Sequence, residues 1–216
     1  DSGSQKIYID GNEVLNSSLN TTTVKKDFAI YLGHEVTPGW EAFDGFMDEV
    51  NVYSGALTAA QVNDLVTQTH PCPEGPPESH LVANWQFNEF SYNGSAAEVN
   101  DSGPNALNGV SDNSVSGIHA VTQFTTPAIE GDPGSCRYLE VSNSTSGFVS
   151  IEDAGDNYLL DFTDKFSLGA WVKVNDLAGS PVHTILTKSG NYVFQVGNDG
   201  GLRFWWWASD NSWHNL

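Results

Sequence analysis

The chain has very few basic residues. Lys and Arg together number eight among 216 residues, whereas Asp and Glu number 27, so the formal net charge is −19 at pH 7. A surface with this charge repels phosphate groups, so we expect neither nucleic acid nor an anionic membrane as a partner. The same charge favours the binding of divalent cations.

Long apolar segments and enzyme motifs are also missing from the sequence. No segment approaches the roughly 20 consecutive apolar residues of a membrane span, so we expect no membrane insertion. Residues 1–4 look like the interior of a loop rather than a signal peptide, so we expect a part of a longer protein. There is no Gly-x-Ser-x-Gly elbow or nucleotide-binding motif, and the six His show no zinc-ligand spacing.

Only one pair of acidic residues approaches a catalytic pattern, and only two cysteines are present. Glu130 and Asp132 lie in a Gly/Pro-rich loop that lacks a third acid and a rigid strand, so we expect no enzyme activity. Cys72 and Cys136 lie in a proline-rich segment and in a Gly/Pro-rich loop. Two free thiols are one interpretation, but a disulfide is expected because such positions are typical of extracellular proteins.

What the sequence does contain is a series of short segments with alternating apolar residues. They cover residues 6–9, 28–32, 45–53, 81–87, 166–174, 183–187, 191–196 and 202–207, and Gly, Asn and Asp separate them. This pattern predicts an all-β, antiparallel sandwich of two sheets. The side chains expected to be buried are Val50, Trp85, Phe87, Leu168, Ala170, Ile185 and Phe194.

One short helix and one break interrupt the strands. Thr58 and Gln61 have the spacing of a capping box, which predicts a helix over residues 58–66. Residues 70–80 hold four of the nine prolines, and proline fixes φ and lacks the N–H donor. We therefore place a linker at residues 70–80.

The two sides of this linker resemble opposite halves of one domain family. Residues 8–11 (YIDG), 30–33 (IYLG), 43–53 (FDGFMDEVNVY) and 56–62 (ALTAAQV) resemble the closing half of a laminin-G-like, concanavalin-A-like jelly roll, the LamG domain. Residues 81–89 (LVANWQFNE), 99–109 (VNDSGPNALNG), 166–171 and 185–190 are similar to its opening half. The resemblance implies a C-terminal half at residues 1–69 and an N-terminal portion at residues 81–216.

The closing half of the domain precedes the opening half in this chain. The family residues expected between the end of the opening half, at Leu216, and the start of the closing half, near Asp1, are absent. Either the chain holds two incomplete domains of a tandem array, or the halves close on one another, within one chain or between neighbouring chains. An open half-sandwich exposes strand edges and an apolar face, so we expect closure. Residues 87–94, 98–103 and 134–137 are also similar to the MshQ-type proteins of MSHA pilus biogenesis, which implies a cell-surface or extracellular location.

The resemblance also implies a structural calcium ion. Calcium takes six to eight oxygen ligands, which acidic Gly/Asn-rich loops supply. Asp48 is expected to point into the core on the side of Phe46 and Val50, and thus to need a partner. An alternative interpretation is that residues 101–103 form a simple turn. The predicted ligands are Asp48, Asp101, Gly103 and Asn105, with Glu89 as a further one.

A second predicted site is aromatic. Residues 204–207 read FWWW, and on a strand Phe204 and Trp206 share one face while Trp205 and Trp207 share the other. Leu202 shares the face of Phe204, so that face is expected to lie in the core. Exposed tryptophan planes stack on sugar rings, although a neighbouring strand could instead cover that face. The predicted ligand-binding residues are Arg203, Trp205, Trp207 and Trp213.

Three classes of function follow. The leading hypothesis is a non-enzymatic, calcium-stabilised adhesion or recognition module that binds a glycan or a surface protein. The alternative is an extracellular filament or pilus-associated subunit that self-associates head to tail through split domains. A glycan-active enzyme is the third. A filament subunit should form concentration-dependent polymers, whereas a module of an array should stay discrete.

Overall fold

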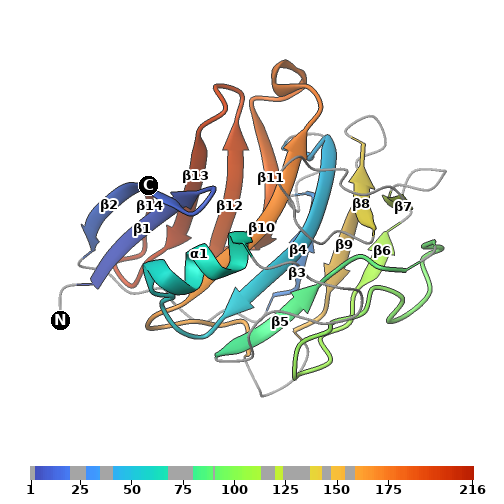
Figure 1. Ribbon diagram of the computed structural model, residues 1–216, viewed down its shortest axis with the longest axis horizontal. Coiled ribbons are helices and arrows are strands. Elements are labelled where there is room, and N and C mark those ends of the chain that lie inside the picture. The colour runs from blue at the N-terminus through green and yellow to red at the C-terminus, as the bar shows by residue number, and fades with distance from the viewer. Residues whose placement is uncertain are drawn as a thin grey trace.

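The fold is a sandwich of two antiparallel sheets, seen in the computed structural model (Figure 1). The core between the sheets contains apolar side chains from both, among them Ile30, Met47, Trp85 and Ile185. The predicted all-β jelly-roll sandwich is therefore confirmed. The structure describes residues 3–19, 28–34, 41–67, 80–89, 91–112, 120–123, 137–142, 147–153 and 159–216.

The larger sheet has seven strands within the described residues, and every pair of neighbours is antiparallel. In spatial order they are β14 (Trp213–Asn215), β13 (Leu202–Trp207), β12 (Tyr192–Gly197), β11 (Val182–Lys188), β3 (Ile30–Leu32), β9 (Phe148–Ile151) and β6 (Val110–Asp112).

The smaller sheet is centred on β4 (Gly45–Tyr53). One edge of β4 pairs along its length with β10 (Ser167–Val174). The other edge pairs with β8 (Tyr138–Val141) and with β5 (Leu81–Trp85), and β7 (Ala120–Gln123) continues the sheet beyond β8. Within the described residues β10 pairs only with β4, which makes β10 an edge strand.

Strands from the two parts of the chain are mixed within both sheets. β3 lies between β11 and β9, and β4 lies between β10 on one side and β5 and β8 on the other. Residues 28–53 and residues 81–216 therefore contribute to one sandwich within one chain. The assignment of residues 1–69 and 81–216 as the two family halves stays a prediction.

A bulge at Glu49 changes which side of β4 faces the core. Glu49 has a φ of +47°, and the register between β4 and β10 slips at this point. Met47 and Val50 are in the core, whereas Phe46, on the other side, is not. The prediction that Phe46 faces the core with Val50 is therefore wrong, because strict alternation ends at a bulge. Asp48 is buried.

Burial divides the predicted core residues into two groups. Val50, Trp85, Phe87 and Ile185 are fully buried, as expected. Leu168, Ala170 and Phe194 pack against the core but stay partly exposed. All three line one cleft, which opens where β10 ends the smaller sheet.

One α-helix, α1 (Ala59–Thr67), and one 3₁₀ turn, η1 (Leu177–Gly179), lie in the described residues. The Gln61 N–H donates to Thr58 Oγ1 at 3.3 Å, and the Thr58 N–H donates to Gln61 Oε1 at 2.9 Å, so the capping box is confirmed. Neither helix is long and apolar enough to cross a membrane in this part of the chain.

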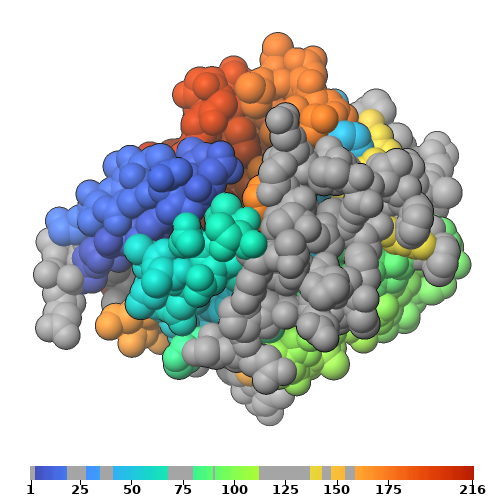
Figure 2. Space-filling view, viewed as in Figure 1, coloured from blue at the N-terminus to red at the C-terminus, as the bar shows by residue number. Residues whose placement is uncertain are grey.

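A hairpin of β1 (Gly3–Ile9) and β2 (Asn12–Leu19) stands outside both sheets. It lies beside α1 in Figures 1 and 2, and a Cβ atom at Gly11 would lie 3.7 Å from a methyl of Val66. Three of its large apolar side chains, Ile9, Val14 and Leu15, are exposed. A two-stranded hairpin alone is only marginally stable in water.

A buried ion cluster fixes β11 to the following turn and to a preceding segment. Lys188 is completely buried and forms ion pairs with Asp153 and, at 3.2 Å, with Asp161. Asn191 Nδ2 donates to Asp161 Oδ1 at 3.0 Å. A buried charge is tolerated only when it is paired and hydrogen-bonded, so these groups depend on one another.

The closure of the sandwich by β4 is tested by a matched pair of glycine substitutions. Gly45 has a φ of +152°, and a Cβ atom there would lie 1.9 Å from the Lys173 carbonyl oxygen in β10. Gly169→Ala, in β10, places its Cβ where no atom lies within 4 Å. We expect Gly45→Ala to lower the free energy of unfolding in urea by at least about 2 kcal/mol, and Gly169→Ala by less than about 1 kcal/mol. Equal effects would contradict the pairing of β4 with β10.

The ion cluster gives a second stability prediction. Lys188→Met leaves two buried carboxylates without their cation, so the free energy of unfolding should fall by about 3–5 kcal/mol. The exposed Lys165→Met is the control and should change it by less than about 0.5 kcal/mol. Adding Asp153→Asn and Asp161→Asn to Lys188→Met should recover part of the loss. A triple variant no more stable than Lys188→Met would argue against this electrostatic account.

Candidate functional site

The predicted aromatic residues gather on one face of the larger sheet. Trp205 and Trp207 alternate with the inward residues of β13 and so share a face with Arg203. Trp213, on β14, is the cross-strand partner of Trp207, and their rings pack edge to face with centroids 5.6 Å apart. Trp213 is 41% exposed and the other three are partly exposed. The structure therefore brings the four predicted residues together on two neighbouring strands.

One carboxylate, that of Asp199, borders this tryptophan face through its ion pair with Arg203. Arg203 Nη2 lies 3.2 Å from Asp199 Oδ2. The Gly201 N–H and then the Arg203 guanidinium lower the pKa of Asp199. Asp210 is instead bound to Ser212 at 2.7 Å and to His214 Nε2 at 2.8 Å, and the His214 ring stacks on Trp206, so Asp210 is linked to the other face of these strands. Asp199 thus provides an ionised acceptor on the face that Arg203 shares with Trp205 and Trp207.

The other face of β13 belongs to the sandwich interior. Leu202 and Phe204 pack against the core, and Trp206 is 3% exposed. Phe204 and Trp206 stack with their ring centroids 5.9 Å apart. The predicted division of this strand into an interior face and a tryptophan face agrees with these contacts.

Asp101, a predicted calcium ligand, is hydrogen-bonded to backbone amides. Its Oδ1 accepts the N–H groups of Asn84 and Gly103, both at 2.8 Å, and its Oδ2 accepts the N–H of Leu107 at 2.8 Å. The bond to Gly103 is the pattern of the simple turn that was the alternative interpretation. Asp101 thereby ties the loop around residues 101–107 to β5.

Two glutamates hold the same region together. Glu89 accepts from the Asn100 N–H at 2.9 Å and from the Tyr92 hydroxyl at 2.6 Å. Burial, and then the charge of Glu89, raise the pKa of Tyr92 above its usual range. Glu98 accepts from the Gly94 N–H at 2.8 Å and from the backbone and side chain of Ser111. These carboxylates serve as acceptors for loop N–H and O–H groups.

This arrangement does not fit the predicted calcium ion. Three N–H groups point their hydrogens at the Asp101 oxygens that a cation would need. Asn105 uses its amide N–H to donate to the Val82 carbonyl at 2.8 Å, and Asp48 Oδ1 accepts the N–H of Glu49 at 2.9 Å. No group of three or more His, Cys, Asp or Glu side chains in the described ranges is placed to hold a metal. Calcium binding stays a prediction without structural support.

Some predicted residues lie outside the described residues. They are Cys72 and Cys136, expected to form a disulfide, and the Glu130 and Asp132 pair. The disulfide therefore stays a prediction.

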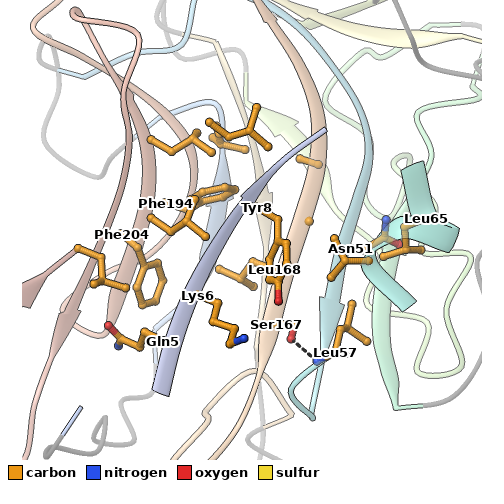
Figure 3. Close-up of a pocket in the computed structure, with 18 of the residues that line it drawn as sticks. Gln5, Lys6, Tyr8, Asn51, Leu57, Leu65, Ser167, Leu168, Phe194 and Phe204 are labelled. Atoms are coloured by element: carbon orange, nitrogen blue, oxygen red, sulfur yellow. Dashed lines mark hydrogen bonds between the residues drawn. The ribbon is translucent and has the colours of Figure 1, made fainter. Parts of the chain in front are cut away.

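Sequence reasoning missed a cleft of about 1350 Å³ at the β10 edge of the sandwich. Figure 3 shows Phe194 and Phe204 on one side of it and Leu57 and Leu65 on the other, with β10 between them. Apolar strand patterns do not reveal it, because they are the same for a closed core. The cleft lies where β10 is the last strand of the smaller sheet. Strand pairing decides which strand is last, and the amino-acid composition of the strands does not reveal it.

Glu98 gives a pH prediction. Burial alone would raise its pKa, but the hydrogen bonds from Asn93, Ser111 and Gly94 outweigh burial and lower it below the usual 4.5. At pH values between the folded pKa and about 4.5, the unfolded chain binds more protons than the folded protein does. The free energy of unfolding should therefore fall as the pH drops below about 4.5 toward the folded pKa. We expect Glu98→Gln to flatten thermal stability against pH in this window, and Ser111→Ala to flatten it less. An unchanged profile in Glu98→Gln would refute the role of Glu98.

Comparison with known proteins agrees with this architecture. A profile of the laminin G-like group in the concanavalin A-like lectin/glucanase superfamily matches residues 1–63 and 143–216. No curated protein sequence and no solved structure gave a match. The resemblance to pilus-biogenesis proteins is not supported by these comparisons and stays a prediction. Because the two matched segments cover more than half of its length, the chain belongs to the concanavalin A-like lectin/glucanase superfamily as a laminin G-like protein.

Proposed function

We propose that this protein is a non-enzymatic recognition module, exposed outside the cell, that binds glycans on its tryptophan face. The observation that carries the proposal is the tryptophan face itself, formed by Arg203, Trp205, Trp207 and Trp213 on β13 and β14. Large aromatic side chains that stay partly exposed on a rigid sheet supply flat apolar area at low conformational cost.

Polar groups beside the rings support a sugar ligand rather than a purely apolar one. A sugar presents a flat apolar face and a rim of hydroxyl groups. The rings match the apolar face, while Asp199 and Arg203 supply an acceptor and a donor for the hydroxyl groups. Ligand sites of this kind combine an apolar surface with a few placed polar groups.

Membership of this family supports a role without catalysis and a location outside the cell. Laminin G-like domains are typically non-catalytic binding modules and are usually extracellular. The net charge of −19 also opposes binding to nucleic acid. Adhesion through a glycan is the function that this combination supports best.

Glycan binding is tested by titrating the protein with cellohexaose, chitohexaose and xylohexaose while following its tryptophan fluorescence. For at least one of them, Trp213→Ala and Trp205→Ala should each raise Kd by about tenfold or more, since buried tryptophan contacts contribute at least about 2 kcal/mol at binding hot spots. Phe28→Ala removes an aromatic side chain that is 49% exposed elsewhere on the chain and should leave Kd unchanged. Binding that survives both tryptophan substitutions would place the ligand elsewhere.

A further inference from the structure

Lys188 is the one lysine that is buried in the part of the chain that the structure describes. Its cross-strand partners are Ile30 of β3 on one side and Tyr192 of β12 on the other. Cross-strand partners share a face of the sheet, and Ile30 and Tyr192 both belong to the core. The Lys188 side chain therefore enters the interior of the sandwich and brings an amine there.

Two carboxylates lie against this amine. Lys188 Nζ donates to Asp153 Oδ2 and lies 3.2 Å from Asp161 Oδ1. The side chains of Asp153 and Asp161 are only 5% and 0% exposed. Asn191 Nδ2 donates to the same Asp161 oxygen at 3.0 Å and so helps to hold that carboxylate in place. One carboxylate would balance one ammonium, so the second leaves a net negative charge in the interior, which a purely structural role does not need.

We propose that Lys188 and Asp153 are joined by an amide bond after the chain has folded, and that Asp161 carries the protons in this reaction. The ion pairs of the structure are then the reactants. This modification lies inside the sandwich and does not rest on the glycan-binding proposal.

The reaction balances without any further reactant. Asp161 accepts a proton from the Lys188 ammonium, and the lone pair that this frees on Nζ attacks Cγ of Asp153. The N–C bond forms and one C–O bond of Asp153 breaks. Asp161 passes two protons, one after the other, from the nitrogen to the departing oxygen, which leaves as water. The amide keeps the third proton of the ammonium, and Asp161 ends as the carboxylate that it was.

The positions of the two reacting groups favour this bond. A nitrogen that donates to a carboxylate oxygen lies within about 4 Å of the carboxylate carbon, near the roughly 3–3.5 Å at which reacting atoms are poised for attack. Lys188 ends β11, Asp153 follows β9 by two residues, and β3 pairs with both strands. Groups that a rigid sheet holds in contact react as if they were at very high concentration.

Aromatic side chains shield the site from water. The Tyr192 ring lies 5.4 Å from that of Phe166 and 6.3 Å from that of Phe162, measured between centroids. Burial, and then the charges of Asp161 and Asp153, raise the pKa of Tyr192 well above its usual range. Both carboxylates thus lie near a hydroxyl that stays protonated. A dry site favours the neutral amine that attack requires, and it slows hydrolysis of the amide once formed.

The amide would fasten the segment after β9 to β11, with β3 between them. It would close a covalent loop between two residues that are 35 positions apart in the chain. β9 and β11 could then not move far apart under tension or in denaturant, whereas ion pairs alone would let them separate.

The test is the mass of the intact, purified chain, measured in denaturant after it has folded. We expect it to be lighter than the sequence mass by one water molecule. Trypsin cuts after Lys and Arg, so it should leave residues 174–203 uncut at Lys188 and joined to residues 138–165. Fragmentation of the joined peptides should place the link at Asp153. Chain that is isolated in urea without having folded should have the full mass and lose water only after refolding.

Three variants test the roles of the two carboxylates, and circular dichroism checks that each variant is folded. Asp161→Asn keeps the shape of the side chain but cannot accept the proton, and Asp153→Ala removes the carbon that is attacked. Both should have the full sequence mass. Asp164→Asn changes an exposed carboxylate three residues from Asp161 and should still lose one water molecule.

Four outcomes would overturn the proposal. The first is a wild-type chain of full mass. The second is loss of water without joined peptides, because a succinimide at an Asp-Gly pair such as Asp199 and Gly200 also releases water. The third is loss of ammonia, which would place the bond at Asn191. The fourth is unchanged loss of water in folded Asp161→Asn. None of these outcomes bears on glycan binding.

Discussion

The fold depends on the pairing of β4 with three other strands. β10 takes one edge of β4, while β8 and β5 take separate parts of the other edge. Without β4 the smaller sheet would separate into strands that have no common neighbour. β3 has the same position in the larger sheet, where it joins the β11 side to the β9 side. Neither sheet is continuous without residues 28–53, although most of the other strands come from residues 81–216.

Strand alternation was sufficient to predict most of this architecture. It located β4 and β13 at the residues where they occur, and it assigned Phe204 and Trp206 to the interior. It failed at Glu49, because a single non-glycine residue with positive φ carries no sequence signal yet reverses the faces of the strand beyond it. It also predicted that Leu168 would be largely buried, but this residue lies on the strand that ends the sheet and stays partly exposed. Burial at that position depends on a neighbour, not on the residue itself.

The predicted sites differ in how far residue type determines their role. The tryptophan face followed from alternation alone, because a large aromatic side chain on the outward face of a strand has few alternatives. The roles of the carboxylates did not follow from the sequence pattern. An Asp such as Asp101, in a loop rich in Gly and Asn, has the composition of a cation ligand and also that of an acceptor for backbone N–H groups. Only the positions of the amides distinguish these roles, and here the loop uses its acids to satisfy its own backbone.

The position of β4 in the chain has a consequence for biosynthesis. Its partner strand β10 ends at Val174, whereas β4 itself ends at Tyr53. At about 5–20 residues per second, a ribosome needs on the order of 6–24 s to make the intervening segment. During this interval β4 can pair with β5 and β8 as they are translated, but the edge of β4 that pairs with β10 has no partner. That edge must therefore stay unpaired, or be held by a chaperone, until β10 has been translated.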